Sequence, residues 1–335
     1  MRTLTTASYC GTGSSAITDF LTEFKTCTSL GDYEFRFAQD PDGISDLEYN
    51  LVENNHRLNS SEAIKRYIRL AKRLNGTWYA KEYELYFGKE WLEATNRYIT
   101  NLTQLKSKVW WHQDQIDRGG CFRFIDRLIN KIYRTVMRAS GSYGKCISLL
   151  EFKEQGYFTY IEESDFLQCT KQYTRELFAY ANKSKMPYFV VDQLVPASNV
   201  KRYSRYFDDL IVFIVERDPR DIYLREKTAG WGIIPTSTVE DFCKWYRITR
   251  EHRKHEKMPK NALFVQFEDF VYDYDVTSKK IMDFAGLKDE DHVDKFKHFD
   301  PEVSIKNTNL KNRYPEYAND VRFIENNLKE YLYDF

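Results

Sequence analysis

Apolar residues follow two patterns along this chain: short continuous runs, and longer segments in which they return every three or four positions. In the first long segment Ala16, Ile17, Phe20 and Leu21 fall on one face, which predicts a helix with a buried stripe. The short runs predict strands at about 187–194, 209–216 and 262–267. The Thr-rich run "RTLTTAS" at about 2–8, which leads into a glycine turn, and "DYEFRF" at 32–37 are two further expected strands. Short strands that alternate with helices are typical of an α/β fold with a central parallel sheet flanked by helices.

Residues from about 55 to 140 differ from the rest, because their pattern is helical and basic with no obvious strand. The segment "SSEAIKRYIRLAKRL" opens with serines and an acidic residue, as helices often do. We interpret this region as a mainly helical insertion on the acceptor side of one domain that spans 1–335. With 335 residues the chain can form such a domain with a sizeable core.

The composition narrows the functional class. Lysine plus arginine and aspartate plus glutamate both number 50, so the zero net charge predicts no nucleic acid as partner. The six cysteines have no short paired spacing, which fits a reducing compartment rather than a disulfide framework or a metal site. No segment resembles a signal peptide or a membrane span. We therefore expect a soluble, cytoplasmic protein.

The turn "CGTGSSA" joins the first expected strand to the first expected helix. Glycines let successive backbone N–H groups converge, and the helix adds its positive dipole end, so such a turn can hold a phosphate. No lysine follows Gly13, which argues against the loop of nucleotide hydrolases. Gly11, Gly13 and Ala16 also fit the dinucleotide pattern G-x-G-x-x-A, with Glu34 near the distance expected for a ribose-binding carboxylate. An NAD- or FAD-dependent oxidoreductase therefore remains an alternative.

A second candidate segment is "ERDPRD", which follows the apolar run 209–216. Pro219 is favourable at the first position of a helix, so Arg217 is expected at the carboxyl end of a strand beside a helix N-terminus. A guanidinium in that place can bind a phosphate through two hydrogen bonds. Asp221, in the first turn, can hold the arginine or stabilise the helix.

The glycine loop together with the strand that ends in Arg-Asp-Pro-x-Asp resembles the PAPS-dependent sulfotransferases. "FVQFEDFVYD", "IMDFAGL" and "DPEVSIKNTNL" are similar to later family segments, the last to a loop that closes over the nucleotide. The resemblance implies a P-loop-like sulfotransferase fold of the bacterial carbohydrate type, 3′-phosphoadenosine 5′-phosphosulfate (PAPS) as co-substrate, and no metal. It also implies the nucleotide-binding residues Gly11, Thr12, Gly13, Ser14, Ser15, Ala16, Arg217, Arg225, Lys306 and Asn307.

Two positions depart from the family pattern. Gly11 stands where the family has a lysine, and Arg225 stands where it has a serine that binds the 3′-phosphate. Arg225 can still contact a phosphate. Arg36, or a lysine of the insertion such as Lys106 or Lys108, is a candidate replacement for the loop lysine.

The resemblance further implies transfer of the sulfuryl group to a hydroxyl of a carbohydrate: a polysaccharide, a glycolipid or a glycoside. Glu34 is the expected general base, and Arg36 shares its face of an extended strand, while His112 is a rival base. A non-catalytic binding module with the same fold is a further alternative.

Arg123, Arg127, Lys131, Arg134 and Arg138 recur at helical spacing beside an apolar stripe in the insertion. Such a stripe is either a solvated helix face or a guide for an anionic acceptor. In the second case the helix 123–138 makes peripheral contact with a membrane surface, at its inner face.

Overall fold

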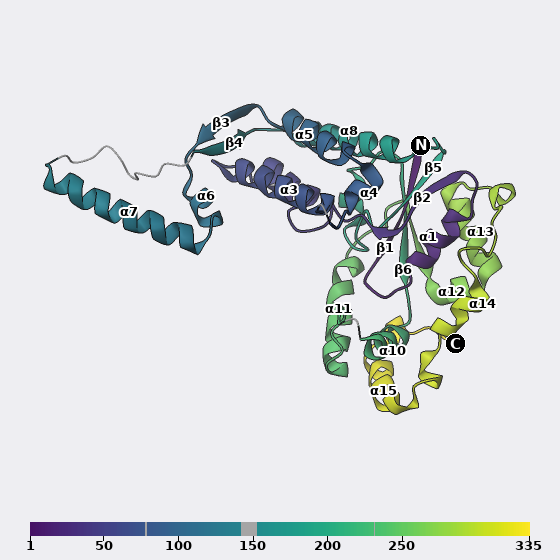
Figure 1. Ribbon diagram of the computed structural model, residues 1–335. Coiled ribbons are helices and arrows are strands. Elements are labelled where there is room, and N and C mark those ends of the chain that lie inside the picture. The colour runs from purple at the N-terminus through teal and green to yellow at the C-terminus, as the bar shows by residue number, and fades with distance from the viewer. Residues whose placement is uncertain (78, 142–152, 231) are drawn as a thin grey trace.

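A five-stranded parallel sheet forms the centre of the computed structural model, which describes residues 1–77, 79–141, 153–230 and 232–335 (Figure 1). Its strands lie in the order β2–β5–β1–β6–β7, and each neighbouring pair is parallel. Their bounds are β1 Arg2–Ser8, β2 Cys27–Glu34, β5 Tyr188–Asp192, β6 Leu210–Glu216 and β7 Ala262–Gln266. The predicted α/β class with a central parallel sheet is confirmed.

Alternate residues of the strands face two separate cores, as the twofold period of a strand requires. In β5, Phe189 and Val191 pack into one core, whereas Val190 packs into the other. The first core joins the sheet to α2 Ile44–Glu48, α3 Asn59–Asn75, α4 Tyr83–Phe87, α5 Glu90–Leu102, α8 Glu163–Ala181 and α9 Val200–Ser204. The second joins it to α1 Ser15–Thr22, α12 Phe267–Tyr272 and α13 Tyr274–Ala285. Helices therefore cover both faces of the sheet.

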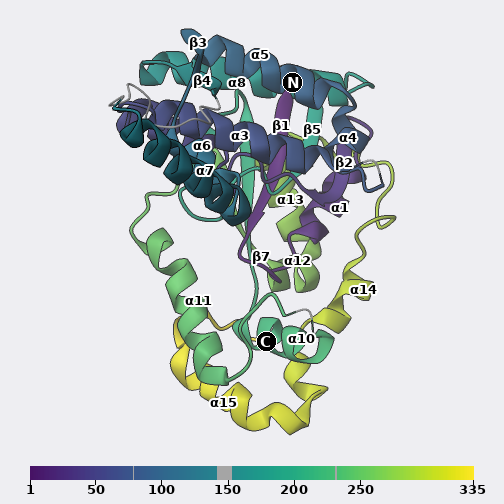
Figure 2. The same ribbon diagram turned by 60° about the vertical axis from the view of Figure 1, so that its left-hand side comes forward.

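A third cluster of buried apolar residues lies beyond the carboxyl end of β6. It joins α10 Pro219–Ala229, α11 Val239–Lys254 and α15 Ala318–Asn327. Between α13 and α15 the chain forms only short helical turns, among them α14 Pro301–Ser304 and the 3-10 turn Ile305–Asn307. Figure 2 shows these helices below the sheet, at the end opposite the insertion.

The region from 55 to 140 is mainly helical, but it also contains a strand that is not obvious in the sequence. Leu105–Val109 forms β3, which pairs antiparallel with β4, Glu154–Phe158. β3 is polar and almost wholly exposed, so no apolar run marks it in the sequence. Beyond it lie α6 His112–Asp117 and α7 Gly120–Ala139, and α7 extends away from the central sheet (Figure 1).

The second strand is also displaced from its predicted place. β2 ends at Glu34, so Arg36 lies beyond the strand rather than within it. Phe35 and Phe37 are fully buried in the first core, and this alternating burial produced the strand-like pattern at 32–37. None of the described helices is long and apolar enough to cross a bilayer.

Candidate nucleotide-binding site

A cleft of about 480 Å³ lies at the carboxyl edge of the sheet. Each of the five strands supplies part of its lining, either with its last residue or with residues that follow it. This is where open parallel sheets bind their ligands. The lining consists of Gly11, Gly13, Ser14, Ser15, Ala16, Asp19, Asp32, Glu34, Asp192, Arg217, Arg225, Phe267, His298, Phe299, Ser304 and Asn307.

The loop between β1 and α1 turns sharply because three of its residues have left-handed backbone angles: Cys10 with φ 53°, Gly11 with φ 71° and Gly13 with φ 84°. A Cβ on Gly13 would lie 2.7 Å from a ring carbon of Phe267, so only glycine fits there. Within the described chain, the N–H groups of Gly13, Ser14 and Ser15 donate to no backbone carbonyl. These three donors therefore remain available to a ligand, at the N-terminus of α1.

Side chains around the loop fix its position. Gln193 donates to the hydroxyls of Ser8 at 2.6 Å and Ser14 at 3.1 Å. Thr12 is buried, and its hydroxyl has no hydrogen-bond partner in the described structure. Thr12 thus does not line the cleft, whereas Ser14 and Ser15 do.

Arg217 follows β6 and is 3% exposed. Its Nη1 donates to the carbonyl of Gly11 at 3.2 Å, its Nη2 donates to the carbonyl of Asn307, and its guanidinium lies 5.2 Å from the ring centre of Phe267. Nε is buried without a partner, and no carboxylate forms a salt bridge with this arginine in the described chain. Burial lowers the pKa of Arg217, although an arginine stays charged near neutral pH. Arg217 is thus a buried cation with an unused hydrogen-bond donor, and it lies beside the N–H groups of the glycine loop. A bound anion would stabilise a buried positive charge of this kind.

The remaining charges of "ERDPRD" have structural partners. Glu216 binds Arg250 at 2.9 Å and Arg253 at 2.8 Å. Asp218 caps α10 by accepting from the N–H of Arg220 at 2.8 Å. Pro219 occupies the first turn, as predicted. These interactions hold the strand end and helix start that place Arg217.

The segment 292–310 closes one side of the cleft and is held at two points. The buried carboxylate of Glu23, just after α1, accepts from the ring of His292 at 2.6 Å and from the N–H groups of His298 and Phe299 at 2.9 Å each. At the other end, Asp221 accepts from the N–H groups of Asn309 at 2.8 Å and Leu310 at 2.7 Å. Asp221 thus holds this segment instead of pairing directly with Arg217.

Asp192, at the carboxyl end of β5, is a cleft residue that the sequence analysis did not single out. It is 3% exposed, and Thr6 of β1 donates a hydrogen bond to its carboxylate. Burial raises the pKa of Asp192 to about 7, and the nearby negative charges of Glu34 and Asp32 act in the same direction. Asp192 lies opposite Glu34 in the pairing of β2 with β5. The cleft therefore contains a carboxylate that titrates near neutral pH.

A fourth carboxylate lines the same end of the cleft. Asp19 projects from α1, and burial raises its pKa to about 6, with a further increase from Asp32. Asp19, Asp32, Glu34 and Asp192 form what we call the acidic end, whereas Arg217 and Arg225 form the basic end. The cleft thus offers a basic end for an anion and an acidic end for hydrogen-bond donors.

Some predicted site residues are not brought into the lining. Arg36 binds Asp40 at 2.8 Å and Glu34 at 3.4 Å, so it contacts the predicted base but does not line the cleft. Lys306 also lies outside the lining, although its neighbour Asn307 is part of it. Lys106 lies on β3, where it donates to Thr100, and is not a lining residue.

Two further candidates have other surroundings. Arg225 lines the cleft, and its Nη1 donates to the side chain of Asn307 at 3.3 Å. His112 lies on α6 in the insertion, where its ring contacts that of Trp111 at 4.4 Å, and it does not line the cleft. In the described chain, no group of three histidine, cysteine or acidic side chains is arranged to hold a metal ion.

No protein-family model matches the chain, and comparison with curated protein sequences finds no match. Among solved structures, the sulfotransferase domain of the olefin synthase of Synechococcus PCC 7002 is similar, with 12% identity and a TM-score of 0.41 over 92% of this chain and 87% of that domain. Sulfotransferase STF1 of Mycobacterium tuberculosis has 12% identity and a TM-score of 0.34 over 92% of this chain and 76% of its own. Retinol dehydratase in complex with androsterone and the inactive cofactor PAP has 14% identity and a TM-score of 0.35 over 100% of this chain and 83% of its own. Two of these three solved structures are sulfotransferases by name.

Proposed function

We propose that this chain transfers a sulfuryl group from PAPS to a hydroxyl of a carbohydrate acceptor. The observation that carries the proposal is the buried guanidinium of Arg217, which has an unpartnered Nε and no carboxylate salt bridge in the described structure. It lies beside the glycine loop, whose three free N–H groups point to a second anion. Two anion-binding places in one cleft fit a nucleotide with phosphate groups at both ends.

Different residues of the cleft would bind the two phosphate-bearing ends of PAPS. The N–H groups of Gly13, Ser14 and Ser15 would hold the 5′-phosphosulfate at the N-terminus of α1. Arg217 and Arg225 would hold the 3′-phosphate at the basic end. When bound, PAPS supplies the sulfuryl group that is transferred. The chain contributes positioning and electrostatic stabilisation, which dominate this kind of in-line displacement.

Glu34 remains the proposed general base. Its carboxylate lines the acidic end and is held by Arg36 at 3.4 Å, within reach of solvent and of an incoming hydroxyl. Asp192 lies opposite Glu34 on the adjacent strand and is a second, buried carboxyl group at the acidic end. Glu34 is thus proposed to take the hydroxyl proton as the oxygen attacks sulfur, while the loop N–H groups stabilise the departing phosphate.

The absence of a loop lysine is offset by other cations of the described lining. The side chains there that can carry positive charge are Arg217, Arg225 and His298. Arg217 is the buried one of the three, so its charge is the least screened by water. Because Arg217 also donates to the carbonyl of Gly11, we propose that it, rather than Arg36, supplies positive charge beside the loop in addition to holding the 3′-phosphate.

The acidic end favours a neutral acceptor rich in hydroxyl groups. Carboxylates accept hydrogen bonds from sugar hydroxyls, whereas a polyanion would be repelled by those of the four carboxylates that are ionised. This supports a glycoside or neutral polysaccharide as the acceptor.

The strand order speaks against the dinucleotide alternative. In that fold the strand bearing the ribose-binding carboxylate neighbours the strand of the glycine loop. Here β5 lies between β1 and β2, so Glu34 is separated from the loop by a whole strand.

Thermal-shift and calorimetric titrations with 3′-phosphoadenosine 5′-phosphate, NAD and FAD test the nucleotide assignment. We expect stabilisation by the first alone, with binding weakened by Arg217→Lys and by Arg225→Ala. Arg247→Ala, which removes an exposed arginine on α11, is the matched control and should bind like the wild type. Equal affinity in the Arg217→Lys, Arg225→Ala and control variants would contradict the phosphate assignment.

Transfer of labelled sulfate from PAPS to neutral glycosides then tests catalysis. Nucleotide binding without transfer to any of a panel of neutral and acidic saccharides would instead identify a binding module.

A further inference from the structure

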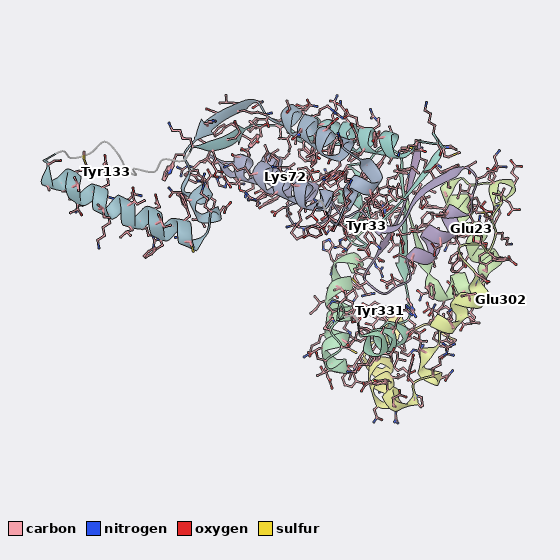
Figure 3. The ribbon with its side chains drawn as sticks, viewed as in Figure 1. Glu23, Tyr33, Lys72, Tyr133, Glu302 and Tyr331 are labelled. Atoms are coloured by element: carbon pink, nitrogen blue, oxygen red, sulfur yellow. The ribbon has the colours of Figure 1, made fainter. Side chains whose placement is uncertain are left out.

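The helix α7, Gly120–Ala139, stands apart from the body of the molecule. Figure 1 shows it beyond β3 and β4, away from the central sheet, and Figure 3 shows the side chains that surround it, with Tyr133 labelled. Among the described elements it packs against α6. With 20 residues it is about 30 Å long.

The burial pattern of α7 is the reverse of that of α3, the other long helix of the insertion. α3 buries Ile64, Tyr67 and Leu70 against the body. In α7 the two buried side chains are polar, Asp126 and Asn130, which share a hydrogen bond of 2.9 Å. Five of its apolar residues are exposed, so a large part of the hydrophobic surface of the helix faces outward.

The exposed apolar residues form one continuous stripe, because they recur every three or four positions. They are Phe124, Ile125, Leu128, Ile132 and Val136, and their relative exposures run from 49% to 69%. An isolated apolar side chain on a surface is ordinary, but an unbroken stripe along a whole helix marks an interaction surface.

A basic stripe runs beside the apolar one. It consists of Arg123, Arg127, Lys131, Arg134 and Arg138, and every one of these residues is exposed. In the described structure none of them takes part in a salt bridge, although arginines elsewhere are widely paired with carboxylates. The one acidic residue of the helix, Asp126, is buried. The apolar surface is therefore bordered by five uncompensated positive charges.

We propose that α7 lies in the plane of an anionic bilayer surface, with its apolar stripe among the acyl chains and its basic stripe at the lipid phosphates. Helices with this division of charged and apolar sides bind in the interface without crossing it. Each basic residue near a negatively charged leaflet adds to the attraction. This inference does not rest on the proposed transferase activity.

The same charges argue against a second copy of the chain as the occupant of this surface. Two α7 helices that paired through their apolar stripes would bring two basic stripes together. Like charges at such flanking positions oppose pairing. An acidic polysaccharide would match the basic stripe but would leave the apolar stripe in water.

The test is co-sedimentation of the purified full chain with vesicles of phosphatidylcholine alone and of phosphatidylcholine mixed with phosphatidylglycerol. We expect binding to the anionic vesicles that weakens with added salt, and little binding to the neutral ones. Arg127→Glu, Lys131→Glu and Arg134→Glu together should lower partitioning by at least about tenfold. Phe124→Ser, Leu128→Ser and Ile132→Ser together should do the same, because the apolar stripe is needed as well.

The control reverses the same number of charges elsewhere, with Lys183→Glu, Lys260→Glu and Lys280→Glu, all exposed and away from α7. This variant should bind the vesicles like the wild type. Analytical ultracentrifugation without lipid tests whether a second copy of the chain covers the apolar stripe instead. The proposal would be overturned by a dimer that the three serine substitutions convert to a monomer, together with no binding to vesicles. Retention by an acidic polysaccharide with no vesicle binding would also overturn it.

Discussion

Arg217 donates to the carbonyl of Gly11 at 3.2 Å, so a guanidinium that follows β6 is joined to the glycine loop that follows β1. The two segments that resemble separate nucleotide-binding motifs are therefore parts of one site. The ring of Phe267 lies against both of them. A change in any of the three should affect the other two.

The first prediction concerns the contact between Gly13 and Phe267. Gly13→Ala places a Cβ 2.7 Å from the ring at a backbone φ of 84°, so both a clash and backbone strain are expected. The free energy of unfolding should fall by about 2–4 kcal/mol in urea titrations. Gly31→Ala is the control, because φ is 80° there but no atom lies within 4 Å of the added Cβ. Equal losses in the two variants would mean that the Phe267 contact contributes nothing.

The second prediction separates the roles of Glu34 and Asp192. Glu34→Gln should retain nucleotide affinity and lower kcat by about 10²–10⁴-fold, as loss of a general base does. Asp192→Asn should keep more of the activity and remove the part of the pH dependence near pH 7 that comes from the titration of Asp192. The measurement is kcat/KM against pH for both variants. Full activity of Glu34→Gln would remove Glu34 from the mechanism.

The third prediction is a dependence of stability on pH. Burial raises the pKa of Asp192 from 3.8 to about 7, so the folded chain binds this proton more tightly than the unfolded chain. The stabilisation is complete below about pH 4 and is lost as the pH rises through 7, with a slope of up to about 1.4 kcal/mol per pH unit. Asp192→Asn should flatten this slope in urea titrations between pH 5 and 8. An exposed change, Asp283→Asn on α13, should leave the slope as in the wild type.

The fourth prediction concerns the anchor of the segment 292–310. Glu23→Gln weakens the acceptor for three hydrogen bonds from that segment, within a buried environment. Amide hydrogen exchange at 292–300 should become faster, and nucleotide affinity should fall because one wall of the cleft loosens. Glu290→Gln, an exposed change in the same region, serves as the comparison. Unchanged exchange in Glu23→Gln would show that the segment is held by its apolar contacts alone.

The sequence predicted β5, β6 and β7 because they are mainly apolar runs between helical segments, and it predicted the polar β1 because a Thr-rich run leads into a glycine turn. It misplaced β2, an edge strand whose residues are half exposed and include Gly31 and Asp32, so burial leaves little pattern there. It missed β3 for a similar reason, since "LKSKV" is stabilised by pairing with β4 and not by burial.

The sequence predicted those parts of the candidate site whose position depends on local backbone structure. The glycine loop and Arg217 have local signatures, namely a turn before a helix and a strand that ends before proline. Asp192 and Asp19 have none, because their burial and raised pKa values arise from elements distant in sequence. Arg36 was predicted to share a strand face with Glu34. Because β2 ends at Glu34, the alternation of side chains along a strand does not extend to Arg36.

The two-point attachment of the segment 292–310 has a consequence for the order of events during synthesis. The hydrogen-bond partners of Glu23 lie 269 to 276 residues after it in the chain. The carbonyl of Asn307 lies 90 residues after Arg217, to which it is bonded. Until the segment 292–310 has been synthesised, the glycine loop and the buried arginine lack one wall of the cleft. Because synthesis proceeds from the N-terminus to the C-terminus, the cleft is complete only after this distant segment has been added.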